Sequence, residues 1–217
     1  MVNGQSTFDL KQAIDDKKVI LFNLSKGSIG DEASEALGRF IIANIKGIAM
    51  RRASLDEEKR VPVHLYIDEC QNFIGPSIHT ILTETRKYKL HLTMAQQVAG
   101  DGMGPDLKQI VFNNVQVNFA GLVKKDSNLP QILNVGIDDL QRLGIGEFYC
   151  RIGTGSTLMM KAYSYLTFDE NQFSSDDYQK FMQAQLQYYR PIGEARVDSN
   201  VVAAASTPQS SYTPDLV

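Results

Sequence analysis

Two adjacent acids close an apolar run in the stretch VHLYIDECQNF, residues 63–73. The run is rich in residues that favour strands, and Asp68 and Glu69 follow it directly. Carboxylates at the end of a buried strand can hold a magnesium ion and activate a water molecule. The alternative is a pair of solvated acids at an ordinary strand end. The pair predicts a hydrolytic site only if another segment binds phosphate.

A phosphate-binding loop would read G-x-x-x-x-G-K-[ST] between a strand and a helix, and the chain contains no such motif. The nearest stretch is LSKGSIGDEASEALG, residues 24–38, but its Lys26 precedes the first glycine. Acids that open the following helix, among them Asp31 and Glu35, would repel a triphosphate. Residues 153–157, GTGST, lack a lysine. We therefore expect the phosphate-binding part to lie outside this chain, and the isolated chain not to hydrolyse ATP measurably.

Strand and helix patterns alternate along the chain. Apolar runs predict strands at 17–26, 63–68, 90–97 and 115–122, and helical spacing predicts helices at 31–52 and from Gly75 onward. The buried stripe predicted for the helix at 31–52 comprises Leu37, Phe40, Ile41, Ile45 and Ile48, and short helices are predicted at 126–133 and 138–143. Residues 146–166 read as two strands around a Gly-Thr-Gly-Ser turn. This order predicts an α/β fold with a mostly parallel sheet flanked by helices, ending in a β-hairpin. His64 alternates with apolar neighbours, which predicts a core histidine rather than a metal ligand.

The C-terminal part has a different character. A helix is predicted from near Ser175 to Pro191, with an apolar stripe, and residues 191–217 are small, polar and proline-bearing, which predicts a flexible tail. We expect three parts: residues 1–170 as the α/β domain, 171–190 as an amphipathic helix and 191–217 as the tail. The stripe comprises Tyr178, Phe181, Met182, Leu186 and Tyr189.

Composition limits the functional classes. The formal net charge is -3 and the pI is about 5.6, so a strongly basic nucleic-acid footprint is absent. Cys70 and Cys150 lie in apolar runs and read as buried, reduced thiols, with a single disulfide as the minority alternative. No apolar stretch has the length of a membrane span, so any membrane contact would come from segments absent here.

The ordered series of motifs resembles the second part of the conjugative coupling-protein ATPases. These are TraG/TraD-like proteins of type IV secretion, related to the HerA and FtsK pumping motors. The resemblance runs from Phe8 to Phe168 and rests on residues 19–52, 63–73, 81–97, 110–122 and 144–156. It implies the C-terminal half of a three-layer RecA-like domain, without the part that carries the phosphate loop.

The resemblance also implies roles for five residues. Asp68 would hold magnesium, and Glu69 would orient or deprotonate the attacking water. Gln97 matches a polar sensor on the neighbouring strand, and Gln96 beside it is a nucleotide-binding candidate. Arg86 could supply a positive charge across a subunit boundary, although a cation at a helix C-terminus is commonly there for the helix dipole alone.

The intact protein would accordingly use ATP and magnesium to pump DNA or recruit a nucleoprotein substrate. Expected partners are secretion-channel or relaxosome proteins and further copies in a ring, a hexamer by the family pattern. The expected location is the bacterial cytoplasm or the cytoplasmic face of the inner membrane. The alternative is a non-catalytic binding module on the same scaffold, which recruits a partner through its C-terminal helix and tail.

Overall fold

The computed structural model describes residues 8–123, 128–162 and 174–189. The chain divides into two compact units, Leu10–Gln172 and a second unit that combines Met1–Asp9 with Phe173–Val217. The first unit contains both sheets and every candidate site residue. The predicted three-part division of the chain remains a prediction.

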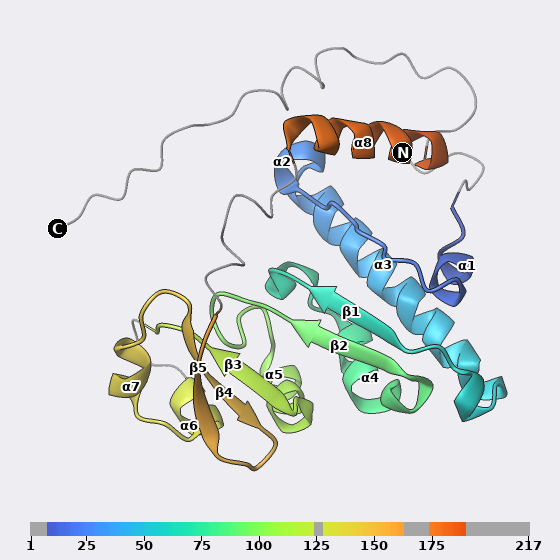
Figure 1. Cartoon of the computed structure of the whole chain (residues 1–217). Helices are drawn as coiled ribbons and strands as arrows, with labels where there is room; N and C mark the ends of the chain where they lie inside the picture. Colours follow the sequence, from blue (N-terminus) through green and yellow to red (C-terminus); the bar gives the residue numbers. More distant parts are fainter. Residues whose placement is uncertain (1–7, 124–127, 163–173, 190–217) are drawn as a thin grey trace. The chain divides into compact units, whose positions relative to one another are not determined.

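A parallel pair of strands forms the first sheet (Figure 1). Strand β1 (Val63–Ile67) pairs with β2 (Leu90–Met94), with Val63 opposite Leu90 and Ile67 opposite Met94. Helix α4 (Pro76–Glu84) makes the crossover and begins with proline after Gly75, where a missing N–H is harmless. The 3-10 turns η3 (Cys70–Phe73) and η4 (Arg86–Tyr88) flank this helix. These strands and this helix were predicted correctly.

One core lies between this sheet and two helices. The long helix α3 (Asp31–Arg51) was predicted, but its buried stripe was read partly wrongly. Leu37 and Phe40 are exposed by 43% and 63%, whereas Ile42 is buried at 4%. Small side chains instead face the inside at the start of the helix, where the Ser34 hydroxyl donates to the Leu24 carbonyl at 2.6 Å. The core comprises Ile42, Ile45, Ala49, Ile67, Cys70, Ile78, Ile81 and Leu90.

The second sheet is antiparallel, with β4 (Glu147–Ile152) between β3 (Val117–Ala120) and β5 (Thr157–Lys161). Helices α6 (Leu129–Leu133) and α7 (Ile137–Gln141) accompany it. One face of the sheet forms a core with these two helices, in which Ala120, Leu133, Leu140 and Leu143 are buried. The hairpin and both short helices were predicted. Helix α5 (Pro105–Asn114), which packs against α4, was not.

The strand predicted at 17–26 is wrong as a buried strand. Residues 18–25 are extended but pair with no described strand, and Val19 and Leu21 are exposed by 89% and 79%. Helices hold both ends of this segment. The Lys18 N–H donates to the Ala13 carbonyl at 3.0 Å, at the C-terminus of α1 (Leu10–Asp15). Helix α2 (Lys26–Ile29) begins at the other end of the segment. Between the segment and β1 lies an apolar groove of about 1020 Å³.

The remaining described helices include 3-10 turns after α3 and the C-terminal helix. Turns η1 (Arg52–Ser54) and η2 (Glu57–Lys59) lead into β1, and α8 (Ser175–Tyr189) starts where predicted. The predicted tail, 191–217, lies outside the described residues. No helix in the described part of the chain is both long and apolar enough to cross a bilayer.

The predicted α/β class with a parallel sheet is confirmed, with parallel pairing confined, among described residues, to β1 and β2. Cys70 and Cys150 are both buried and free, as predicted. His64 is not a core histidine. Its ring is exposed and stacks on that of His91 across the strand pair, with centroids 4.9 Å apart, because both residues face the side away from the core.

Candidate functional site

The turn after β1 presents the two acids at the carboxyl end of the parallel sheet. Asp68 is exposed, and its Oδ1 accepts the Glu69 N–H at 3.0 Å. Glu69 has a left-handed backbone, with φ 48° and ψ 46°, which costs energy for any residue with a Cβ. The Cys70 N–H donates to the Ala95 carbonyl at 2.9 Å and ties this turn to the end of β2. A strained residue fixed between two strand ends is a common feature of functional sites.

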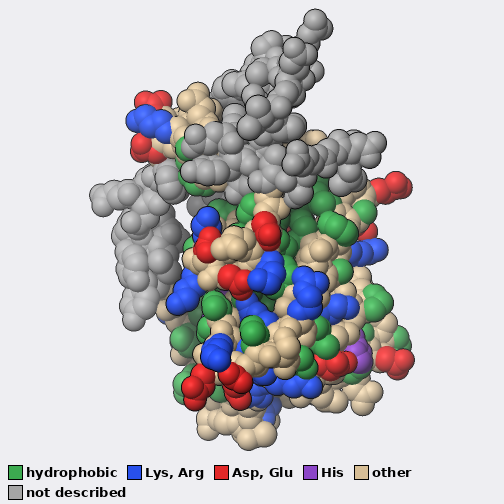
Figure 2. Space-filling view, turned by 90° about the vertical axis from the view of Figure 1, so that its right-hand side faces the viewer, with side chains coloured by type: hydrophobic (Ala, Val, Ile, Leu, Met, Phe, Trp, Pro, Cys, Tyr) green, Lys and Arg blue, Asp and Glu red, His purple; other side chains and the backbone are tan. Residues whose placement is uncertain are grey.

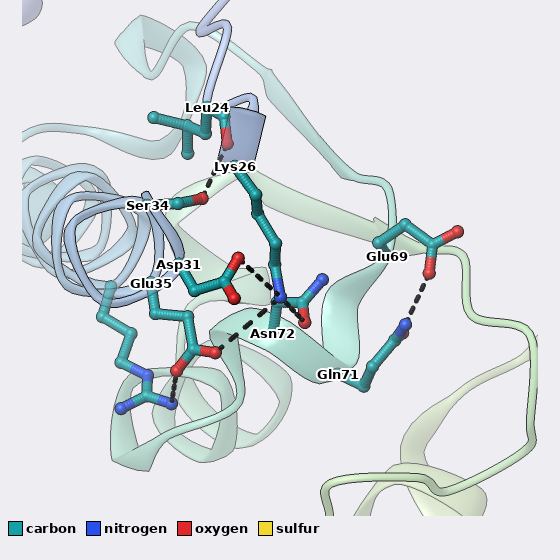
Figure 3. A network of polar contacts seen from close by, with 9 residues as sticks. Leu24, Lys26, Asp31, Ser34, Glu35, Glu69, Gln71 and Asn72 are labelled. Carbon is teal, nitrogen blue, oxygen red and sulfur yellow. Dashed lines mark hydrogen bonds and ion pairs between the residues drawn. The ribbon is translucent and has the colours of Figure 1, made fainter. Parts of the chain in front are cut away.

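Two amide side chains hold the Glu69 carboxylate. Gln97, two residues beyond Ala95, donates to Oε1 at 2.9 Å. Gln71 donates to Oε2, a contact that is drawn in Figure 3. The hydrogen bond from Gln97 has the largest effect and lowers the pKa of Glu69. The hydrogen bond from Gln71 and the positive charge of Lys26 lower this pKa further. The carboxylate is therefore ionised and oriented at neutral pH, as a proton acceptor must be. The structure brings the predicted pair Glu69 and Gln97 together.

Gln96 faces a different environment. Its Oε1 accepts a weak hydrogen bond from the Cys70 thiol at 3.7 Å, away from the Glu69 carboxylate. Burial raises the pKa of the Cys70 thiol to about 11, so this cysteine is an inert part of the core. Gln96 therefore contacts the buried Cys70 of the turn, whereas Gln97 contacts the Glu69 carboxylate.

Lys26 lies close to the acid turn (Figure 3). Its Nζ donates to Asn72 Oδ1 at 3.0 Å and lies 4.0 Å from both the Asp31 and Glu35 carboxylates. Glu35 also pairs with Arg39 at 3.2 Å. The positive charge of Lys26 is therefore shared with acids of α3.

The charges decide what this arrangement can do. Asp68 and Glu69 lie at the turn, and the only nearby cation shown by the contacts of the described residues, Lys26, is already paired. Within the same residues no three His, Cys, Asp or Glu side chains gather to hold a metal ion. Magnesium commonly takes one or two carboxylates, water and the phosphates of a nucleotide, so the donor set fits it when phosphates are present. The site can accept a proton and share a cation, but it offers a triphosphate no free positive charge.

Arg86 lies elsewhere. It starts the turn η4, which leads into β2, whereas Asp68 and Glu69 follow β1. Because β1 and β2 are parallel, the start of β2 lies at the opposite end of the strand pair from the end of β1. Arg86 therefore does not join the acids of its own chain. A role across a subunit boundary stays a prediction.

Three residues of the site were not assigned roles by sequence reasoning. Gln71 and Asn72 belong to the D-E-x-Q-N series after β1, so their spacing was visible but their roles were not. Lys26 was considered only as part of a phosphate loop. Its bond to Asn72 joins residues 46 positions apart, which no local pattern could have revealed.

Comparison with solved structures finds matches to a coupling protein and to a viral genome packaging NTPase. The plasmid coupling protein TrwB, solved with the non-hydrolysable GTP analogue GDPNP, is 18% identical with a TM-score of 0.55, over 72% of this chain and 43% of that one. The unbound bacterial coupling protein TrwBΔN70 gives 18% and 0.50, over 59% and 38%. The genome packaging NTPase B204 from Sulfolobus turreted icosahedral virus 2, with ATP-γS, gives 17% and 0.41, over 55% and 62%.

No protein-family model and no curated protein matches the chain. The likeness to TrwB shows the fold, an α/β arrangement of RecA-like type. The chain spans 38–62% of the lengths of these three structures.

Proposed function

We propose that this chain supplies the water-activating and magnesium-binding half of a nucleotide-hydrolysing enzyme of the coupling-protein type. The observation that carries the proposal is the Glu69 carboxylate, held by Gln97 and Gln71 at the carboxyl end of β1. Ligands of open α/β sheets bind at that end of the strands. An oriented carboxylate there suits a role in hydrolysis better than a purely structural role. Two hydrogen bonds and a strained backbone hold this acid in place, although it contributes nothing to a hydrophobic core.

The proposed roles follow from the geometry. Glu69 accepts the proton of the water whose oxygen attacks the terminal phosphorus, while the nucleoside diphosphate leaves. Gln97, bonded to the same carboxylate at 2.9 Å, sets its orientation and reports on the occupant of the site. Asp68, exposed beside it, would hold magnesium together with the phosphates. The ion would supply positive charge to the phosphoryl oxygens.

In this proposal the phosphate-binding loop is supplied by a segment that this sequence does not contain. ATP is the proposed nucleotide by family resemblance, and GTP is an alternative because TrwB was solved with a GTP analogue. Movement of DNA or of a nucleoprotein through a secretion channel, a ring of copies, and a place at the bacterial inner membrane are parts of the same proposal. Lys and Arg side chains intermingle with acids on the face drawn in Figure 2, so DNA contacts on that face would be local.

The test is a pair of variants in the assembled enzyme that contains this chain and its phosphate-binding half. We expect Glu69→Gln to lower turnover by roughly 10²–10⁴-fold with nucleotide affinity preserved, because glutamine keeps the shape but accepts no proton. Asp68→Asn should weaken magnesium-dependent nucleotide binding instead. Nucleotide affinity by calorimetry and steady-state phosphate release separate the two effects.

Glu57→Gln is the matched control, since it removes an exposed carboxylate from the turn η2. It should change neither quantity. The isolated chain should release no phosphate above an Asp68→Ala, Glu69→Ala double variant. Near-normal turnover of Glu69→Gln would refute the proposed role of Glu69.

A second candidate, a non-catalytic binding module, is favoured by helix α8. Tyr178 and Met182 of its stripe are exposed by 47% and 38%, as expected of a helix that binds a partner. The two candidates differ in one measurement. A binding module would keep its cellular activity in Glu69→Gln and lose it when both Tyr178 and Met182 are replaced by serine.

A further inference from the structure

The open face of the parallel sheet carries two histidines side by side. His64 of β1 and His91 of β2 occupy directly opposite positions in the register of the two strands. Their imidazole rings lie nearly parallel, with centroids 4.9 Å apart and an interplanar angle of 18°. The pairing of two regular strands therefore fixes the backbone beneath both rings, which a pair of histidines on a loop would not have.

Both rings are accessible to a ligand. His64 and His91 are exposed, and neither imidazole forms a hydrogen bond or an ion pair with the part of the chain that the structure describes. The other side chains that β1 and β2 place on this face, Tyr66 and Thr93, carry no charge. A ligand that reaches the pair from this side therefore meets ring nitrogens, and no carboxylate or ammonium group of the two strands competes for it.

The chemistry of imidazole selects the class of ligand. A neutral imidazole offers one nitrogen lone pair, and it is a preferred ligand of zinc, copper and nickel ions. Magnesium and calcium prefer oxygen ligands, so the pair does not suit the ion expected at the acid turn. Two neighbouring rings offer two lone pairs on one side of the sheet. Metal–nitrogen distances are about 2.0–2.1 Å, so rotation of the two exposed side chains has to bring one nitrogen of each ring to a shared ion.

We infer that His64 and His91 form a two-histidine site for a divalent transition-metal ion of the zinc, copper and nickel group. The inference is independent of the proposed function, because it uses neither the acids nor a nucleotide. No third His, Cys, Asp or Glu joins the pair among the described residues, so water completes the coordination. Structural zinc centres take four protein ligands, and half that number corresponds to an exchangeable ion with a Kd of roughly 1–100 µM.

An ion at this position would join the two strands. The sheet formed by β1 and β2 has two strands among the described residues, and a pair of strands by itself has marginal stability. The two histidines come together only when the strands pair, so the ion binds the folded chain in preference to the unfolded one. Metal binding therefore stabilises the sheet whose strand ends carry Glu69 and Gln97.

Titration of the full 217-residue chain with zinc chloride tests the inference. The protein is purified without a histidine tag, and calorimetry measures the affinity. We expect about one ion per chain with a Kd in the range above. His64→Gln and His91→Gln should each weaken binding at least about tenfold, because each removes one of the two nitrogen ligands. Magnesium chloride should give the same titration in wild type and in both variants.

His79→Gln is the matched control. His79 is the remaining histidine of the sequence and is exposed on helix α4, away from the pair in the chain. Its replacement should leave zinc affinity unchanged. Circular dichroism verifies that all three variants are folded, which we expect because the three side chains are exposed.

Two further measurements report on the ligands and on the strand pair. With copper(II) as the probe, nitrogen hyperfine splitting in electron paramagnetic resonance should show two imidazole nitrogens in wild type and one in His64→Gln or His91→Gln. Zinc at about a hundred times its Kd should raise the Tm of wild type and of His79→Gln by roughly 5–10 °C, and should leave the Tm of the other two variants nearly unchanged.

Three outcomes would overturn the inference. Equal zinc affinity in wild type, His64→Gln and His91→Gln would show that the pair does not bind the ion. Loss of zinc binding in Asp68→Asn, with both histidines present, would place the ion at the acid turn. A stoichiometry of one ion per two chains would show that two copies build the site together, so that the pair of one chain is not a site by itself.

Discussion

The two sheets each leave one face uncovered, and the two open faces differ in chemistry. In the parallel sheet the open face carries His64, Tyr66, His91 and Thr93, with Tyr66 exposed by 71%. In the antiparallel sheet the open face, here called the apolar face, carries Val117, Phe119, Phe148, Cys150, Ile152, Leu158 and Met160. Polar and ring side chains such as the stacked histidines are compatible with water. The apolar face instead exposes large hydrophobic side chains, among them Phe119, Ile152 and Leu158, to the solvent.

The difference extends to where each sheet contributes to function. The parallel sheet does so at its end, where Asp68 and Glu69 follow β1 and Gln97 follows β2. The antiparallel sheet presents a face, and no candidate site residue lies on it. We interpret the first as the chemical part of the chain and the second as the assembly part.

The largest effect that tests this comparison is a matched leucine pair. Leu133 in α6 lies under the covered face of the second sheet and is 0% exposed, whereas Leu158 on the apolar face is 60% exposed. Leu133→Ala should lower the free energy of unfolding by about 2–5 kcal/mol, and Leu158→Ala should change it by less than about 0.5 kcal/mol. Urea denaturation measures both.

The assignment of the open face would be wrong if Leu158→Ala were as costly as Leu133→Ala in the isolated chain.

Local patterns predicted the elements that position the acids. A short sequence window is enough to recognise the apolar runs of β1 and β2, the proline at the first position of α4 and the helical spacing of apolar residues in α3. Helix α5 was missed because its sequence, PDLKQIVFNN, begins directly after a glycine-rich loop and has a weak apolar stripe. The predicted strand at 17–26 has the right composition, but strand pairing depends on tertiary contacts that composition does not contain.

The site was predictable in part. The acids and the sensor glutamine follow strand ends, so their meeting could be expected from a parallel sheet. The contribution of Lys26 could not, because its partners Asn72, Asp31 and Glu35 come from two other elements. The left-handed backbone of Glu69 was also hidden, since glutamate has no preference for that conformation.

Backbone strain provides an intermediate effect that the structure predicts at both ends of the parallel strand pair. Glu69 at the acid edge and Lys89 at the start of β2 both have left-handed backbones, with φ 48° and 57°. Lys89→Gly should be more stable than Lys89→Ala by ~1 kcal/mol, since glycine adopts positive φ without steric cost. Glu69→Gly should likewise be more stable than Glu69→Ala. Thermal unfolding of the four variants measures this.

Function separates the two positions. Lys89→Gly should leave nucleotide turnover of the assembled enzyme unchanged, whereas Glu69→Gly should abolish it. If glycine stabilised neither position, the left-handed conformations would carry no strain, and backbone strain would no longer support a special role for Glu69.

The smallest expected effect compares a carboxylate of each sheet as the pH falls. Glu147 of β4 accepts the Gly144 N–H at 2.9 Å and pairs with Lys161 at 3.3 Å, and these contacts lower its pKa, as Gln97 and Gln71 lower that of Glu69. A carboxyl whose folded-state pKa lies below its unfolded value of about 4.3 stabilises the fold above that pH. The contribution is lost as the pH falls through the folded-state pKa.

Wild type should therefore lose stability relative to Glu147→Gln and to Glu69→Gln between about pH 4.5 and 3, and its stability should run parallel to that of both variants near neutral pH. Urea denaturation at pH 7, 4.5 and 3 measures this. A wild-type curve parallel to Glu69→Gln at all three values would mean that the two glutamines do not hold the acid, and would remove the main electrostatic difference between Glu69 and an ordinary solvated carboxylate.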